Sequence, residues 1–155
     1  MADETLVLLG SEVRGKTVRL LQGVTDREAR WTPEGLSNNI VWHAGHSLWV
    51  VEALGLAPAT GKGLQLPDGW KELFAAGSKP SAATAWPALA EVVDRLQDQL
   101  TRLTGAIRGL SEERLSQIVD PARNRTLRYS ILHGIHDEAG HQGEIYLLKK
   151  LIARK

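Results

Sequence analysis

The sequence contains no cysteine, and aromatic residues make up only 5% of the chain. Without cysteine there can be no disulfide, zinc–thiolate site or thiol nucleophile, so any metal must be held by histidine, aspartate or glutamate. No apolar run approaches the roughly 18 residues that a membrane-spanning helix needs. The N-terminal segment also lacks the basic stretch and long apolar run of a secretory signal. We therefore expect a cytoplasmic protein with no membrane partner.

The sequence also lacks an excess of charge of either sign. Nineteen Lys and Arg residues stand against eighteen Asp and Glu, which gives a formal net charge of +1. Proteins that bind nucleic acid usually show a marked basic excess, so we expect no nucleic-acid partner. A length of 155 residues and a hydrophobic content of 43% predict one globular domain over residues 1–155.

Helical periodicity dominates what is present. The clearest stretch covers residues 85–110, where apolar residues recur at alternating steps of three and four. Thr84 is the expected N-cap of this helix, with Pro87 in its first turn. Three more helices are predicted over residues 3–23, 40–56 and 126–153. The pattern predicts an all-α protein with a four-helix bundle.

The second and third of these helices are separated by a long connection. Residues 57–82 are rich in glycine and proline, with one short helix expected around Trp70 to Phe74. Long connections in compact domains are uncommon and are often functional. A crossover of this length also lets the second and third helices lie parallel or diagonal in the bundle.

A short internal repeat marks the ends of the first and third helices. Residues 21–28 and 107–114 both contain a glycine stop, an apolar residue, a Thr or Ser cap and an acidic first turn. Each segment is followed by a loop with a proline and then by a helix that carries histidines. The chain therefore reads as two helix pairs with a related plan.

All five histidines lie on the second and fourth predicted helices. Residues four apart share a helix face, so His133, Asp137 and His141 form a stripe that Ile145 continues, which predicts that it faces the bundle interior. On the second helix, His46 lies on an aromatic face with Trp42 and Trp49, and His43 precedes it by a turn. Two inward polar clusters result.

These clusters fit a metal site. Two ligands four apart on one helix and a third from a facing helix can converge on one divalent ion, with a position left for water or substrate. A second interpretation has the same histidines and carboxylates hydrogen-bonding one another in the core. Gly45, Gly140 and Gly143 lie beside the proposed ligands, where they either permit close helix approach or only loosen the helices.

The two histidine segments resemble motifs of the DinB/YfiT-like superfamily. Residues 38–46 (NNIVWHAGH) are similar to its second-helix motif, and residues 133–145 (HGIHDEAGHQGEI) to its fourth-helix motif. The resemblance implies a DinB-like four-helix bundle with one divalent metal, zinc or nickel, held by His46, Asp137 and His141. Most members have histidine where this chain has Asp137.

The resemblance also leaves other residues open as ligands or supporting groups. Glu138 or His136 would replace Asp137 if the fourth helix is rotated from our estimate. His133 is a candidate fourth ligand or supporting partner, and His43, His133 and Glu138 are candidates for the general base by proximity along the helices. A basic loop over residues 123–128 either meets an anionic substrate or is simply solvated.

The resemblance implies a metal-dependent enzyme with hydrolase-like or thiol S-transferase-like chemistry, connected with stress or detoxification. Its partners would be a small-molecule substrate, such as a low-molecular-weight thiol, and a second copy of the chain in a homodimer. Two alternatives remain at this point. One is a module that binds metal or a small ligand without turnover, and the other is a structural bundle whose histidines are hydrogen-bonded in the core.

Overall fold

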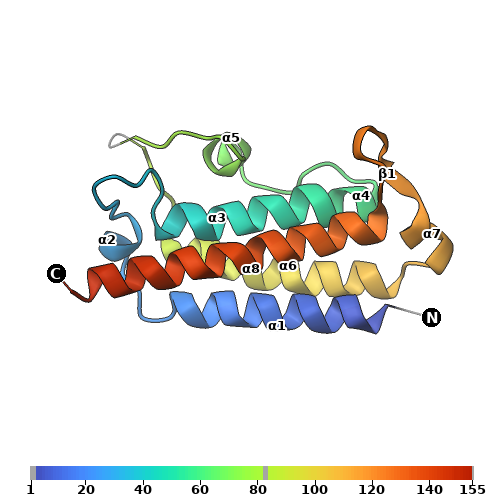
Figure 1. Cartoon of the computed structure of the whole chain (residues 1–155), viewed down its shortest axis with the longest axis horizontal. Helices are drawn as coiled ribbons and strands as arrows, with labels where there is room; N and C mark the ends of the chain where they lie inside the picture. The colour runs from blue at the N-terminus through green and yellow to red at the C-terminus, as the bar shows by residue number, and fades with distance from the viewer. Residues whose placement is uncertain (1–2, 82–83, 155) are drawn as a thin grey trace.

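The computed structural model describes residues 3–81 and 84–154, and it is an all-α bundle, as predicted (Figure 1). Four long helices form it, and short elements connect them. The helices are α1 (Glu4–Leu21), α2 (Asp26–Ala29), α3 (Ile40–Val51), the π-helical turn η1 (Glu52–Leu56), α4 (Ala57–Thr60), α5 (Trp70–Phe74), α6 (Leu89–Arg108), α7 (Glu112–Ser116), the 3₁₀ turn η2 (Pro121–Arg123) and α8 (Leu127–Ile152); the strands are β1 (Ile118–Asp120) and β2 (Arg125–Thr126).

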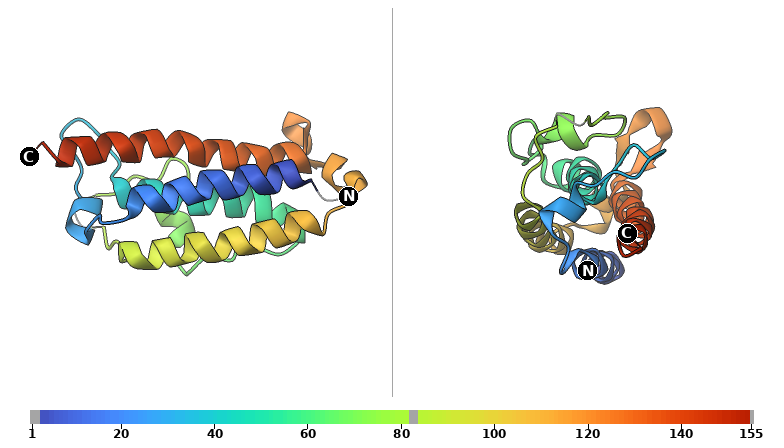
Figure 2. Two further views of the ribbon diagram at one scale, coloured as in Figure 1. Left: turned by 90° about the horizontal axis from the view of Figure 1, so that it is seen from below. Right: turned by 90° about the vertical axis from the view of Figure 1, so that its left-hand side faces the viewer.

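The four long helices are arranged as a square. α1 packs against α6 and α8, and α3 packs against the same two helices, so α1 and α3 lie on one diagonal (Figure 2). α3 and α6 run in the same direction, as the long crossover predicted (Figure 1). Within that crossover α5 lies against α3 on the outside of the bundle. α3 and α8, which carry all five histidines, are therefore neighbours.

The core consists of two apolar clusters with a polar layer between them. One cluster includes Leu21, Leu96 and Leu148, and the other includes Leu6, Leu103 and Ile131. Between them along the helices lie buried polar residues from the four elements that line the bundle. We call this group the buried polar layer: Arg14 and Thr17 from α1, Glu52 from η1, Gln99 from α6, and Glu138 and Gln142 from α8.

The internal repeat appears as two short capped helices. Thr25 caps α2 in a capping box with Glu28, and the Ser111 side chain accepts a hydrogen bond from the Arg114 backbone to cap α7. Both short helices follow a long helix directly. Each can begin there because Thr or Ser at the N-cap satisfies backbone N–H groups that have no partner inside the helix. The prediction of related caps at these two points is confirmed.

Two predicted helix boundaries are wrong. α6 begins at Leu89 rather than at residue 85, and Thr84 is not its cap. Pro87 disfavours helical geometry at the residue before it, and the Leu89 N–H is instead capped by Asp26 of α2 at 2.8 Å. The helix of residues 40–56 also continues to Thr60. Its π-helical turn, closed by the Ala57 N–H to the Glu52 carbonyl, changes the hydrogen-bond register just before Pro58, which has no N–H to donate.

The segment before α8 was predicted as a loop and instead forms a small hairpin. β1 and β2 pair antiparallel, with Ile118 opposite Thr126. Each arginine of this region has a local partner: Arg123 pairs with Asp120 at 3.1 Å, Arg125 lies over the Tyr129 ring, and Arg128 pairs with Glu112 at 2.6 Å. Arg128 also precedes Asp137 by roughly 13 Å along the helix axis. This loop therefore does not supply free cations to the candidate site.

Over residues 3–81 and 84–154, the structure contains no helix with the length and apolar character to cross a membrane.

Candidate metal centre

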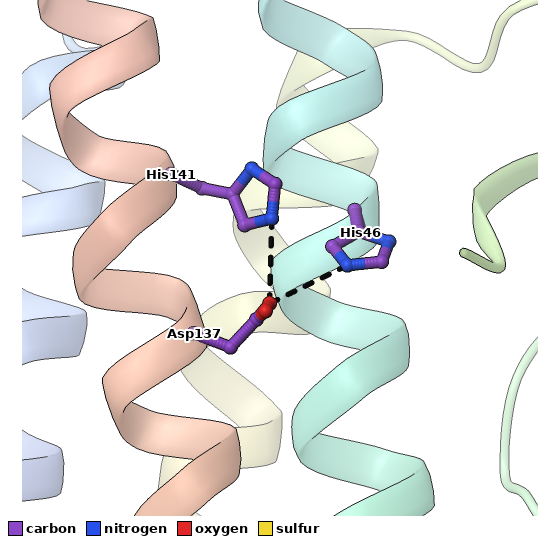
Figure 3. A group of neighbouring side chains, drawn as sticks. All are labelled: His46, Asp137 and His141. Carbon is purple, nitrogen blue, oxygen red and sulfur yellow. Dashed lines mark ion pairs between the residues drawn. The ribbon is translucent and has the colours of Figure 1, made fainter. Parts of the chain in front are cut away.

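Three side chains from two neighbouring helices converge at one point. His46 comes from α3, and Asp137 and His141 come from adjacent turns of α8 (Figure 3). One ligand atom from each lies within 4.8 Å of the other two. The Nε2 atoms of His46 and His141 are 3.5 and 3.4 Å from the same Asp137 oxygen, Oδ1. The structure thus brings together the three residues that the family resemblance implied.

His46 is held between two tryptophans, as its position on an aromatic face predicted. The Trp42 indole stacks on the imidazole with ring centroids 4.7 Å apart, and Trp49 lies on it at 5.4 Å. The Trp42 indole N–H in turn donates to the Ser78 hydroxyl at 2.7 Å, after α5. The ring of His46 therefore has little freedom to rotate.

The crossover fixes the protonation pattern of His46. Its Nδ1 lies 2.7 Å from the backbone carbonyl oxygen of Phe74, which can only accept, so Nδ1 carries the proton. In the neutral ring, Nε2 then presents a lone pair toward Asp137. Gly45 makes this contact possible, because a Cβ there would lie 2.2 to 2.4 Å from three atoms of the Phe74 ring.

His43 supports the other imidazole. Its Nδ1 lies 2.8 Å from Nδ1 of His141, so one of the two rings donates to the other. Burial, together with the smaller effects of the nearby His141 and His46, lowers the pKa of His43 to about 3. His43 is therefore neutral at ordinary pH. With His43 accepting from His141 Nδ1–H, the His141 Nε2 lone pair faces Asp137.

Asp137 completes the group as an ionised carboxylate. An N–H of His141, and next one of His46, lowers its pKa well below the usual range when it points at the carboxylate. Its Oδ1 is buried, yet neither imidazole contact is a hydrogen bond. An unsatisfied buried carboxylate oxygen is expensive, because burial removes the water that would solvate it. A cation at this point would satisfy it.

The donor set fits a divalent transition metal. Neutral imidazole nitrogen and carboxylate oxygen are the ligands that zinc, nickel, iron and manganese take in proteins. His46 is nearly buried, with 7% of its side chain exposed, whereas Asp137 and His141 are 27% and 19% exposed. The group is thus buried on the α3 side and partly exposed to solvent on the α8 side.

Two of the other candidate residues are not at this site. Glu138 faces the opposite way, into the buried polar layer, where it accepts from Arg14 and Thr17. His133 stacks with Tyr129 and His136 on another side of α8. Neither side chain lies among the three ligand atoms, because Glu138 is about 100° around the helix from Asp137, and the drift of about 40° per four residues turns His133 about 80° away from His141.

The flanking glycines separate into two kinds. Gly45 permits close packing, since the Phe74 ring occupies the space of its missing side chain. Gly140 and Gly143 have nothing within 4 Å of a Cβ built on them, so close helix approach does not explain them. The main feature that the sequence did not reveal is the Phe74 carbonyl, because any residue type supplies the same backbone acceptor.

The comparisons with known proteins agree with this architecture. A family model described as the DinB superfamily matches residues 10–145. The crystal structure of a conserved protein from Enterococcus faecalis is similar to this chain with a TM-score of 0.77 and 18% sequence identity, covering 100% of this chain and 99% of that one. Likeness at this identity shows the fold alone. No curated protein sequence matches the chain.

Proposed function

Because the chain belongs to the DinB superfamily, we propose that it is a divalent-metal-dependent enzyme whose ion is held by His46, Asp137 and His141. The observation that carries this proposal is the convergence of three ligand atoms, one from each residue, within 4.8 Å of one another. The proton of His46 is directed at Phe74, Nδ1 of His141 lies against His43, and the buried Asp137 Oδ1 has no hydrogen bond. Zinc or nickel is the ion that we expect.

Each of the three residues would have a separate role in such a site. When bound, a divalent ion would lower the pKa of a water molecule or thiol that it coordinates and so generate a nucleophile near neutral pH. His46 and His141 supply neutral donors whose rings are fixed from behind by Phe74 and His43. Asp137 supplies the negative charge and lies on the solvent-accessible side. We propose hydrolase-like or thiol-transfer chemistry on a small molecule.

A metal-binding module without turnover is the second candidate. Three side chains are available to hold an ion, whereas two candidates for the general base have other partners. His43 lies against His141, and Glu138 accepts from Arg14. Both candidates predict bound metal, and only the enzyme predicts product. The purely structural alternative predicts neither.

Elemental analysis of the purified protein tests the metal site. We expect about one equivalent of zinc or nickel per chain in the wild type, and a loss to background in His46→Ala, Asp137→Ala and His141→Ala. His136→Ala is the matched control, since this exposed histidine of α8 stacks with His133 instead. Equal and negligible metal in all five proteins would refute the site.

Turnover then separates the enzyme from the module. The metal-loaded protein is assayed with p-nitrophenyl acetate as a hydrolysis probe, and with glutathione and 1-chloro-2,4-dinitrobenzene as a thiol-transfer probe. Turnover that is lost in His46→Ala and kept in His136→Ala supports the enzyme. Stoichiometric metal with no turnover of either probe favours the module.

A further inference from the structure

The buried polar layer lies at the same level of the bundle as the candidate metal centre. On α8, Glu138 and Gln142 directly follow the two ligands Asp137 and His141. Consecutive residues of a helix point about 100° apart, so each ligand faces α3 while the residue after it faces α1. A rotation of α8 that changes one set of contacts must change the other.

The α1 side of this arrangement is fixed by directional contacts. The Glu138 carboxylate accepts from Arg14 Nε at 2.8 Å, from Arg14 Nη2 at 2.9 Å and from the Thr17 hydroxyl at 2.6 Å. Gln142 Nε2 donates to the Val13 carbonyl at 2.6 Å and to Thr17 at 3.0 Å. Arg14, Thr17 and Glu138 are each at most 2% exposed, so water cannot replace these bonds.

The same network reaches the helix that carries His46. Arg14 also donates to Gln99 Oε1 at 2.9 Å, and Gln99 Nε2 donates to the Leu48 carbonyl on α3 at 2.9 Å. Gln99 further donates to Glu52 at 2.8 Å. One chain of buried hydrogen bonds therefore connects α8, α1, α6 and α3 around the level of the ligands.

The ligand-bearing part of α8 needs such an anchor. Gly140 and Gly143 lie on either side of His141 with nothing within 4 Å of a Cβ built on them. Glycine lowers helix propensity, so the local sequence does little to hold this stretch rigid. Apolar packing alone specifies helix rotation loosely, whereas a buried polar group tolerates only the position in which its partners meet it.

From this geometry we propose that Arg14 and Glu138 are positioning residues of the metal centre: their ion pair sets the rotation of α8 that turns Asp137 and His141 toward His46. The inference rests on the proposed metal site and deepens it. Neither residue contacts the ligand atoms. Their effect passes through the backbone of α8, where Glu138 is covalently next to Asp137.

The double variant Arg14→Met/Glu138→Leu tests this role. Replacing a buried ion pair with apolar residues of similar volume often leaves a protein folded and stable, so fold and positioning can be separated. We expect an unfolding midpoint near that of the wild type. Zinc affinity, measured by competition with a chromophoric chelator, should fall by about 10- to 100-fold. The visible spectrum of the cobalt-substituted protein should change as well.

Three further variants sharpen the result. Arg128→Met/Glu112→Leu makes the same change of composition at a more exposed pair, which joins α8 to α7 away from the ligands, and should keep wild-type zinc affinity. Glu138→Gln, which keeps an acceptor for Arg14, should restore most of the affinity. If the double variant does not fold, Thr17→Val takes its place. It removes one hydrogen bond to Glu138 and one from Gln142, and it should also weaken zinc binding.

A folded variant, either the double variant or Thr17→Val, with wild-type zinc affinity and an unchanged cobalt spectrum would overturn the positioning role. A wild type that binds no metal would instead refute the proposed function. In that case the ring nitrogen NMR signals of His46 and His141 in the metal-free proteins still test the positioning role. Signals that shift in the double variant support that role, and identical signals overturn it.

Discussion

At the scale of single residues, Gly45 is the position where one added carbon has the largest expected effect. Phe74 is fully buried, and the Cβ of Gly45→Ala would lie 2.2 to 2.4 Å from its ring. Overpacking of this kind costs about 1–3 kcal/mol. Because the displaced Phe74 also holds His46 through its carbonyl, we expect weaker metal binding together with a lower free energy of unfolding in urea.

Gly140→Ala is the matched control for this substitution. Gly140 is exposed, lies within α8 and has nothing within 4 Å of a Cβ built on it, so alanine there should raise the free energy of unfolding by up to about 1 kcal/mol. If Gly45→Ala unfolds at the same urea concentration as the wild type, Phe74 has room to move, and the tight packing under His46 is not a constraint.

His43 is the second residue whose role one substitution can define. His43→Leu keeps an apolar body in a buried position but removes the partner of His141 Nδ1. Removing a group that orients a metal ligand typically lowers metal affinity by about 10- to 100-fold, which we expect here in chelator competition. His133→Leu, on another side of α8, should leave the affinity unchanged. An equal loss in both variants would argue against a specific role for His43.

At the scale of elements, the capping box of α2 makes stability depend on pH. The Thr25 backbone N–H and hydroxyl both donate to Glu28 at 2.8 Å, which lowers the pKa of that carboxyl below 4.5. A carboxylate with a lowered pKa stabilises the fold above its unfolded pKa, and this contribution disappears as the pH falls through the folded value.

Thr25→Ala tests this directly. At pH 7 the lost cap should cost about 1 kcal/mol in urea unfolding. The difference between variant and wild type should shrink as the pH falls below 4.5, because the wild type then loses the Glu28 contribution too. A difference that stays constant from pH 7 to pH 3 would show that the carboxylate takes no part in the cap.

The elements also show what periodicity can and cannot predict. The four long helices were predictable because each has an apolar face over several turns, and the caps because Thr25 and Ser111 act on neighbouring residues. The start of α6 was not predictable, since the first backbone N–H of that helix donates to Asp26, which is distant in the sequence. The small hairpin before α8 was missed because its strands are too short to show an alternating pattern.

At the scale of the whole molecule, the candidate site was predictable only in part. His46, Asp137 and His141 follow from a family motif and a local helical stripe. The Arg14–Glu138 pair joins residues that are 124 positions apart, and nothing in their neighbourhoods indicates that they meet. Long-range polar contacts depend on how the helices dock, whereas the ligands depend mainly on which face of each helix is buried.

A groove on the outer surface is the candidate contact with a second copy of the chain. This groove of about 290 Å³ runs between α1 and α8, and over the described residues its lining includes His133 and His136 but no Lys, Arg, Asp or Glu. Leu9, Leu132 and Tyr129 are 36%, 40% and 45% exposed there. Interface centres are depleted in charge and enriched in aromatic side chains such as Tyr129, so we propose that a homodimer would use this face.

Leu132→Glu should convert that dimer into a monomer, because it places an unpaired charge in the middle of the buried face. Light scattering after size-exclusion chromatography measures the mass. Leu36→Glu, at a leucine that is 46% exposed outside the groove, should leave it unchanged. Metal content should stay at the wild-type level in both variants, since the ligands face α3 and the groove faces α1. A wild type that is already monomeric at 100 µM would rule out self-association through this groove.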